Sequence, residues 1–241
     1  MTKEKFYKNL GLEENNYSLE RLKIDILRDK KWVQVLKSAR FFKYLPFIDL
    51  VFVAGSMAIG NVKEDSDFDL VIGTKENRLY TARFLALIFF MLTGAKRRKN
   101  VSSGKQSKNK LCFNHFVTPS SYKFSPPYNI YWQELYQNLV PIYGEEKIIN
   151  QFFNANDWSG KRYFLGDLRH NKDVSIIKLV IEKILAGKLG DFLEKILAYL
   201  QIQKINNGLK NEAPGFKPRI KINQEELELY LSTSKIQKLI S

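Results

Sequence analysis

The chain has 241 residues, of which 44% are hydrophobic, and a formal net charge of +14. This length and apolar content suit a globular protein with one large domain or two small ones, and they exclude a disordered or fibrous chain. A single cysteine allows no internal disulfide, and two histidines leave no zinc site of the usual cysteine and histidine kind. We therefore expect any metal to be bound by oxygen.

Two further properties bear on location and partners. The first residues, MTKEKFYKNLGLEENN, lack the apolar segment of a secretory signal, and the most apolar helix candidate, 84–92, is too short to cross a bilayer. We expect a cytoplasmic protein with no membrane partner.

The positive charge favours RNA, DNA or a nucleoside triphosphate (NTP), because Lys and Arg release counterions when they approach phosphates. The alternative explanation of the positive charge is a lysine-rich composition that is unrelated to function.

The first half of the chain predicts helices around two strands. Hydrophobic residues recur at three- and four-residue steps between 18 and 44, which predicts one long helix or two consecutive helices ending at Pro46. Next, IDLVFVAG predicts a strand, SMAIG a short helix and, after a polar turn, DFDLVIG a second strand. Residues 75–93 predict an apolar helix that packs against a sheet.

The second half begins with a basic segment. Residues 95–110 are rich in Lys and Arg and contain no acidic or aromatic residue, which predicts a loop before the strand LCFNHFVT. Helical patterns follow in YNIYWQELYQNLVPIYG, with Pro141 as the terminating residue, and over 145–156 and 174–205. A break rich in Pro and Gly then precedes a short strand, RIKI, and a predicted final helix, EELELYLSTSKIQKLI.

Two aspartates interrupt the second predicted strand. Asp67 and Asp69 are two residues apart, so their side chains point to one face of the strand. Phe68, Leu70 and Ile72 then point to the opposite face, which we expect to pack. Paired carboxylates repel each other at neutral pH unless a divalent cation lies between them, and hard oxygen ligands select Mg²⁺ or Mn²⁺. An exposed acidic turn, EDSDFD, is the alternative.

A glycine and a serine follow the first predicted strand. Gly55 would let the backbone approach a phosphate closely, and the Ser56 hydroxyl and neighbouring N–H groups can donate hydrogen bonds to it. An ordinary helix cap is the alternative role of Ser56. The order of this turn and the acid pair, in a strand context, predicts a phosphate-binding turn followed by a metal site.

The stretch AGSMAIGNVKEDSDFDLVI resembles the signature of the polymerase-beta-like nucleotidyltransferases, in which a Gly-Ser turn precedes an Asp-hydrophobic-Asp strand. Through ARFFKYLPFIDLVFVAGSMA, KLCFNHF and ELYQNLVPIYG, the chain is also similar to a bacterial and archaeal subgroup over about 39–158. The resemblance implies a mixed sheet flanked by helices. We expect an α/β (α+β) fold with an N-terminal helical segment (1–45), a nucleotidyltransferase core (46–120) and a mostly helical C-terminal domain (121–241).

The resemblance also implies a reaction, the Mg²⁺-dependent transfer of a nucleoside monophosphate from an NTP to an acceptor hydroxyl. Residue by residue, Gly55 and Ser56 match the phosphate-contacting turn, and Asp67 and Asp69 match the catalytic, metal-ligating aspartates. The basic loop at 96–110 favours RNA, such as a tRNA end, as the acceptor. A small hydroxylated molecule, as in antibiotic adenylylation, is the alternative, and the oligomeric state stays open.

The chain departs from the family pattern at the third carboxylate, which active members carry on a later strand. The strand LCFNHFVT contains no Asp or Glu, and Asn114 or His115 are its nearest polar substitutes. Glu134, Asp157 or Asp167 would have to reach in from the helical half. A non-catalytic nucleotide sensor or RNA-binding protein is therefore the rival hypothesis, and a plain scaffold is the third.

Several other residues have either a role in the site or a structural role. For each of them we expect the structural role: ion pairs for Arg78 and Arg83, packing for Tyr128, Tyr131 and Trp132, and a core position for Cys112.

Overall fold

The computed structural model describes residues 16–95, 108–126, 128–160, 170–210 and 219–230. Its strands form one mixed sheet in the order β4-β1-β2-β3-β6-β5. Their bounds are β1 Ile48–Val53, β2 Phe68–Thr74, β3 Leu111–Val117, β4 Val140–Gly144, β5 Arg219–Ile222 and β6 Glu226–Tyr230. Strands β2 and β3 are parallel, and the other neighbours are antiparallel. This mixed sheet with flanking helices confirms the expected α/β fold.

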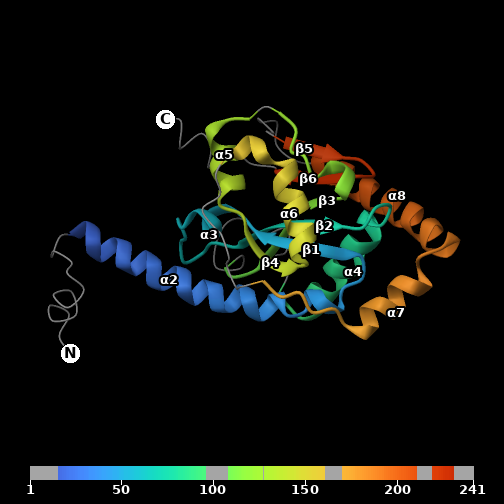
Figure 1. Cartoon of the computed structure of the whole chain (residues 1–241), viewed down its shortest axis with the longest axis horizontal. Helices are drawn as coiled ribbons and strands as arrows, with labels where there is room; N and C mark the ends of the chain where they lie inside the picture. The colour runs from blue at the N-terminus through green and yellow to red at the C-terminus, as the bar shows by residue number, and fades with distance from the viewer. Residues whose placement is uncertain (1–15, 96–107, 127, 161–169, 211–218, 231–241) are drawn as a thin grey trace.

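Helices cover both faces of the sheet (Figure 1). Their bounds are α2 Asn16–Ala39, α3 Gly55–Ile59, α4 Leu79–Leu92, α5 Ile130–Gln137, α6 Glu146–Ala155, α7 Ile176–Ile184 and α8 Lys188–Lys210. Short 3-10 turns lie at Phe42–Tyr44, Pro119–Ser121 and Asp157–Ser159. In Figure 1, α2 projects from the body on one side, whereas α7 and α8 meet at the opposite end.

The two faces of the sheet bury two separate hydrophobic clusters. Phe68, Leu70 and Ile72 of β2 pack on one face with residues of α2, α4 and α8. Val71 packs on the other face with residues of α5 and α6. Because side chains alternate along a strand, Asp69 lies on the same face as Val71. The expected packed face of β2 is therefore confirmed.

Two segments that we predicted as helical are strands. The segment VPIYG is β4 at the edge of the sheet, where Pro141 is tolerated because an edge strand has one unpaired side. The segment ELELY is β6, in which Leu227 and Leu229 enter the core. The C-terminal part thus adds three strands to the sheet as well as helices, and the boundaries proposed at 45 and 120 remain a prediction.

The other predicted elements are found close to their expected positions. Most of the basic loop, residues 96–107, and the end of the predicted final helix, 231–241, lie outside the described residues. Among the helices that the structure does describe, none is both long and apolar enough to cross a membrane.

Candidate functional site

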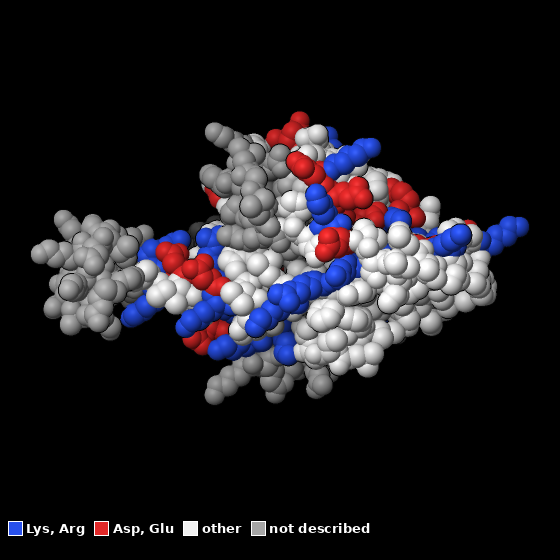
Figure 2. Space-filling model, turned by 60° about the horizontal axis from the view of Figure 1, so that its bottom comes forward, with Lys and Arg blue, Asp and Glu red and all other residues white. Residues whose placement is uncertain are grey.

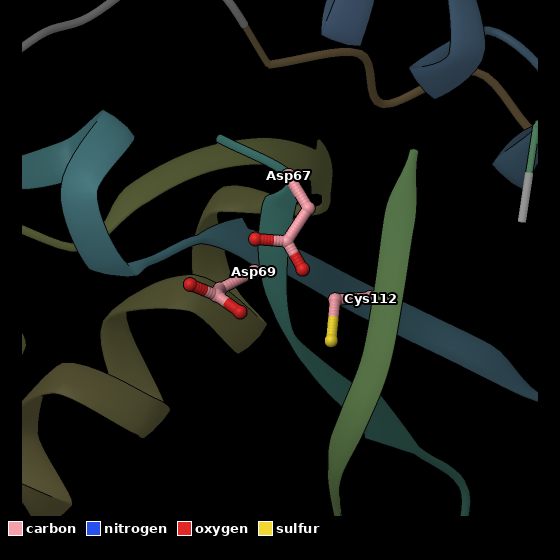
Figure 3. A group of neighbouring side chains, drawn as sticks. All are labelled: Asp67, Asp69 and Cys112. Atoms are coloured by element: carbon pink, nitrogen blue, oxygen red, sulfur yellow. The ribbon is translucent and has the colours of Figure 1, made fainter. Parts of the chain in front are cut away.

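Asp67 and Asp69 lie beside Cys112 where β2 and β3 begin. One carboxylate oxygen of each aspartate and the cysteine Sγ all lie within 4.8 Å of one another. Figure 3 shows the two carboxylates and the thiol on the same side of the paired strands. Asp67 is 8% exposed and Cys112 4%, whereas Asp69 is half-buried. A group of this size and composition can hold one metal ion.

The register of the two parallel strands explains why a cysteine completes the group. Asp69 lies opposite Cys112, and after a register shift Val71 lies opposite His115. Cys112 thus lies next to the aspartates, whereas His115 belongs to a different group, so the expectation of His115 as their polar neighbour is wrong. The expectation for Asn114 stays a prediction. The expectation that oxygen alone binds the metal stays a prediction, although the group includes a thiol.

His115 belongs to a second buried polar group. Its Nε2 lies 3.3 Å from Glu226 Oε1, and Lys221 Nζ donates to Glu226 Oε2 at 2.8 Å. Burial by itself would raise the pKa of Glu226, but hydrogen bonds from His115 and Lys221 hold that pKa below its usual value. Glu228 completes this group. The group ties β3 to the C-terminal strands.

The structure describes two of the three acids that we proposed for the third carboxylate, Glu134 and Asp157, and neither lies beside the acid pair. Among the residues that the structure describes, none of them joins the group around Asp67 and Asp69. Glu134 is exposed on α5, where its backbone carbonyl accepts a hydrogen bond from Asn138 Nδ2, and Asp157 is exposed in a 3-10 turn. Asp167 lies outside the described residues.

The Gly-Ser turn is pressed against the acid pair. Gly55 has a φ of +64°, and a Cβ at this position would lie only 2.3 Å from Asp69 Oδ2. Next to it, the Ala54 N–H donates to the Asp69 carbonyl at 2.9 Å. Glycine is required here both by its positive φ and by the close approach. Ser56 follows and is half-buried. The turn and the acid pair, which are separate in sequence, therefore meet.

Comparison with known families agrees with this arrangement. The family described as "Nucleotidyltransferase domain" matches residues 34–125, a segment that contains the turn, both aspartates and Cys112. This segment is therefore similar to nucleotidyltransferase domains. It covers less than half of the chain. No protein among the curated sequences matches the chain.

Lys31 of helix α2, which lies just before the matched segment, braces that segment. Lys31 is a fully buried lysine whose Nζ donates to the carbonyls of Glu64 at 3.2 Å and Ser66 at 2.8 Å, and to Asn109 Oδ1 at 2.9 Å. Burial lowers the pKa of Lys31, and the charge of Lys108 lowers it further. Lys31 thus fixes the turn that leads directly into Asp67.

We expect Lys31→Met to destabilise the protein by about 2 kcal/mol, because it removes charge-assisted hydrogen bonds and leaves their acceptors unsatisfied. Urea unfolding followed by circular dichroism measures this loss. The control is Lys37→Met, which removes an exposed lysine of the same helix and should leave the unfolding free energy nearly unchanged. Equal stability of the two variants would contradict the bracing role.

Helix α5 lies on the acid-pair side of the matched segment. Burial raises the pKa of Tyr131, and the charge of Asp69 raises it further, so this phenol stays neutral near the aspartate.

Trp132 is buried, and the Tyr128 ring stacks on Trp158 with centroids 4.2 Å apart. The expected packing role is confirmed for Tyr128 and Trp132.

The two arginines of α4 have structural partners. Arg78 Nη2 lies 2.7 Å from Asp191 Oδ1, and its Nε donates to the Leu185 carbonyl at 3.2 Å. Arg83 donates to Gln201 of α8. The expected ion pair is therefore confirmed for Arg78, while the partner of Arg83 is an amide rather than an acid.

Proposed function

We propose that this chain is a divalent-cation-dependent nucleotidyltransferase, which moves a nucleoside monophosphate from an NTP, such as ATP, to an acceptor hydroxyl. The observation that carries the proposal is the close meeting of Asp69 and the Gly55 turn within a segment similar to nucleotidyltransferase domains. A glycine forced against a carboxylate in this way is what a site for a triphosphate and its metal requires.

Each residue of the site has a role in this proposal. Asp67 and Asp69 would hold Mg²⁺ or Mn²⁺, and Gly55 and Ser56 would contact the triphosphate. The bound cation would supply neutralisation of the negative charge that develops on the phosphates. The acceptor oxygen forms a bond to the α-phosphorus while the bond to the bridging oxygen breaks, pyrophosphate leaves with the electron pair, and the hydroxyl proton passes to water.

With Cys112, the site offers a metal two carboxylates and a thiol instead of three carboxylates. Carboxylates suit Mg²⁺ and Mn²⁺, whereas a thiolate prefers softer ions such as Zn²⁺. If Cys112 contributes a ligand, the site would bind thiophilic divalent ions better than a site made of three carboxylates does. A second candidate function is a protein that binds NTP without transferring it, because within the described part of the chain no third carboxylate joins the acid pair.

We expect Cys112→Asp to increase Mg²⁺ affinity in the presence of a non-hydrolysable NTP by about tenfold, since a third carboxylate adds a hard, charged ligand. Isothermal titration calorimetry measures this change. Cys112→Ser is the matched control, because it removes the thiol without adding a charge. Cd²⁺ should give an ultraviolet thiolate-to-metal absorption band with the natural protein and none with Cys112→Ser. Absence of this band from the natural protein at saturating Cd²⁺ would show that Cys112 is not a ligand.

Two measurements together test the proposed reaction. The first is Mg²⁺- or Mn²⁺-dependent binding of NTP, and the second is release of pyrophosphate in the presence of candidate acceptors. Binding with release supports transfer, binding without release over a broad acceptor screen supports the non-catalytic candidate, and no binding contradicts both.

The acceptor class can be separated by salt. The net charge of +14 supports an RNA or tRNA acceptor. Binding of an RNA acceptor should weaken steeply between about 50 and 200 mM salt, because counterions are released from the phosphates, whereas binding of a small hydroxylated acceptor should change little.

A further inference from the structure

Helices α7 and α8 expose a broad apolar face. Ten of their large hydrophobic side chains are at least 40% exposed: Ile176, Ile177, Leu179, Val180 and Ile184 of α7, and Leu189, Phe192, Ile196, Tyr199 and Leu200 of α8. We call this set the α7–α8 face. In Figure 2, uncharged residues dominate the lower right of the molecule, the side on which Figure 1 places these helices.

The inner side of α7 is polar, which reverses the usual arrangement of a surface helix. Lys178 and Glu182 are its buried residues. Lys178 Nζ donates to the Tyr143 hydroxyl at 3.1 Å, and Glu182 accepts from the Phe47 N–H and from Lys75 Nζ, both at 2.6 Å. Buried charges with such partners fix the rotation of the helix, so its apolar residues must face outward.

Helix α8 is held in a similar way. Glu194 is buried and accepts hydrogen bonds from the backbone N–H groups of Tyr80 at 2.7 Å and Thr81 at 2.8 Å, at the start of α4. Gln201 Nε2 donates to the Tyr80 carbonyl at 2.8 Å. The exposed hydrophobic residues of α8 recur at three- and four-residue steps on the other side of the helix. Such a stripe is the pattern of a helix that packs against another helix.

We propose that the α7–α8 face is the interface of a homodimer, in which two copies of the chain pair about a twofold axis. Its exposed apolar side chains amount to roughly 1,000 Å², whereas the largest apolar patch of a typical monomer is about 300–600 Å². A stable dimer buries about 800 Å² on each partner, so the face is large enough. Homodimer interfaces are also the most apolar class of protein interface.

The apolar nature of the face favours a second copy of the chain over a charged partner. The face consists of apolar side chains with one exposed lysine, Lys183, beside them on α7, so it offers no acidic patch to a basic protein and only a single positive charge to a polyanion. The two helices are consecutive in the chain, and twofold rotation sets an apolar surface against an identical one. With a net charge of +14 on each chain, pairing through a mostly apolar face also keeps the like charges of the two copies apart.

The test is the solution mass of the natural chain and of two matched variants. Interfaces of this size have dissociation constants of micromolar or lower, so at about 10 µM light scattering should give twice the mass of one chain. One chain has a mass of 28.2 kDa. Ile176→Glu combined with Phe192→Glu should give a monomer. Ile130→Glu is the control, because Ile130 is 77% exposed and begins a helix, as does Ile176, which is 78% exposed.

Each possible result either supports the proposal or overturns it. A dimer that the double variant dissociates and the control leaves intact supports the proposal. A monomeric natural chain, a dimer that survives the double variant, or a dimer that the control also breaks overturns it. As a measurement without variants, hydroxyl-radical modification of Phe192 and Tyr199 should fall as protein concentration rises, and modification independent of concentration contradicts the proposal. Neither measurement requires nucleotide, so both remain decisive whatever the reaction proves to be.

Discussion

Asp69→Asn should weaken Mg²⁺-dependent NTP binding by roughly 100-fold while the protein stays folded. The substitution replaces a charged ligand with a neutral amide, a loss of about 3 kcal/mol that corresponds to roughly 100-fold weaker binding of the metal and nucleotide together. It also removes one of two neighbouring carboxylates that repel each other, so no large destabilisation is expected. Calorimetric titration with a non-hydrolysable NTP measures the binding, and thermal unfolding measures the stability.

The matched control is Asp65→Asn. Asp65 is an exposed aspartate of the turn before β2, and it does not belong to the group formed by Asp67, Asp69 and Cys112. This variant carries the same change in net charge, so a similar loss of binding would show that general electrostatic attraction, rather than ligation, is at work. Unchanged nucleotide affinity in Asp69→Asn would rule out the proposed role of that carboxylate.

Gly55→Ala should reduce NTP binding by about 100-fold, because displacement of a site group by about 1 Å has an effect of that order. The new Cβ would lie 2.3 Å from Asp69 Oδ2, so either the carboxylate or the turn must move. The positive φ of Gly55, +64°, adds strain of about 1 kcal/mol for any residue with a Cβ. Nucleotide affinity and unfolding free energy are both measured.

The control variant Gly94→Ala separates the effect of the contact with Asp69 from the effect of backbone strain. Gly94 has a similar φ, +68°, but a Cβ there would meet nothing within 4 Å. The control should therefore lose about 1 kcal/mol of stability from backbone strain and keep its nucleotide affinity. If both alanine variants bind NTP equally well, the contact between the turn and Asp69 has no functional importance.

Much of the fold could be predicted from periodicity. The strands around the Gly-Ser turn and the acid pair, the apolar helix α4 and the long helix α2 follow from hydrophobic spacing and from turn residues. In ELELY the alternation of Glu and Leu was a signal for the strand β6, and the helical pattern expected around it concealed that signal. Strand β4 gave a weaker signal, since it is short and contains Pro141.

The third member of the site could not be predicted because it depends on register. Nothing in the sequence says that Cys112, rather than Asn114, lies opposite Asp69, since the register in which two strands pair sets that neighbour. The bracing of the turn by Lys31 likewise depends on how α2 packs. A buried lysine was not distinguishable from the many lysines expected on the surface. Both features are contacts between segments far apart in the chain.

The most direct test of the account is a crystal structure of the chain with Mn²⁺ and a non-hydrolysable NTP. The account predicts an anomalous Mn²⁺ peak coordinated by Asp67, Asp69 and phosphate oxygens, with the triphosphate against the Gly55–Ser56 turn. A nucleotide bound elsewhere, or an acid pair with no metal at saturating Mn²⁺ and NTP, would contradict it.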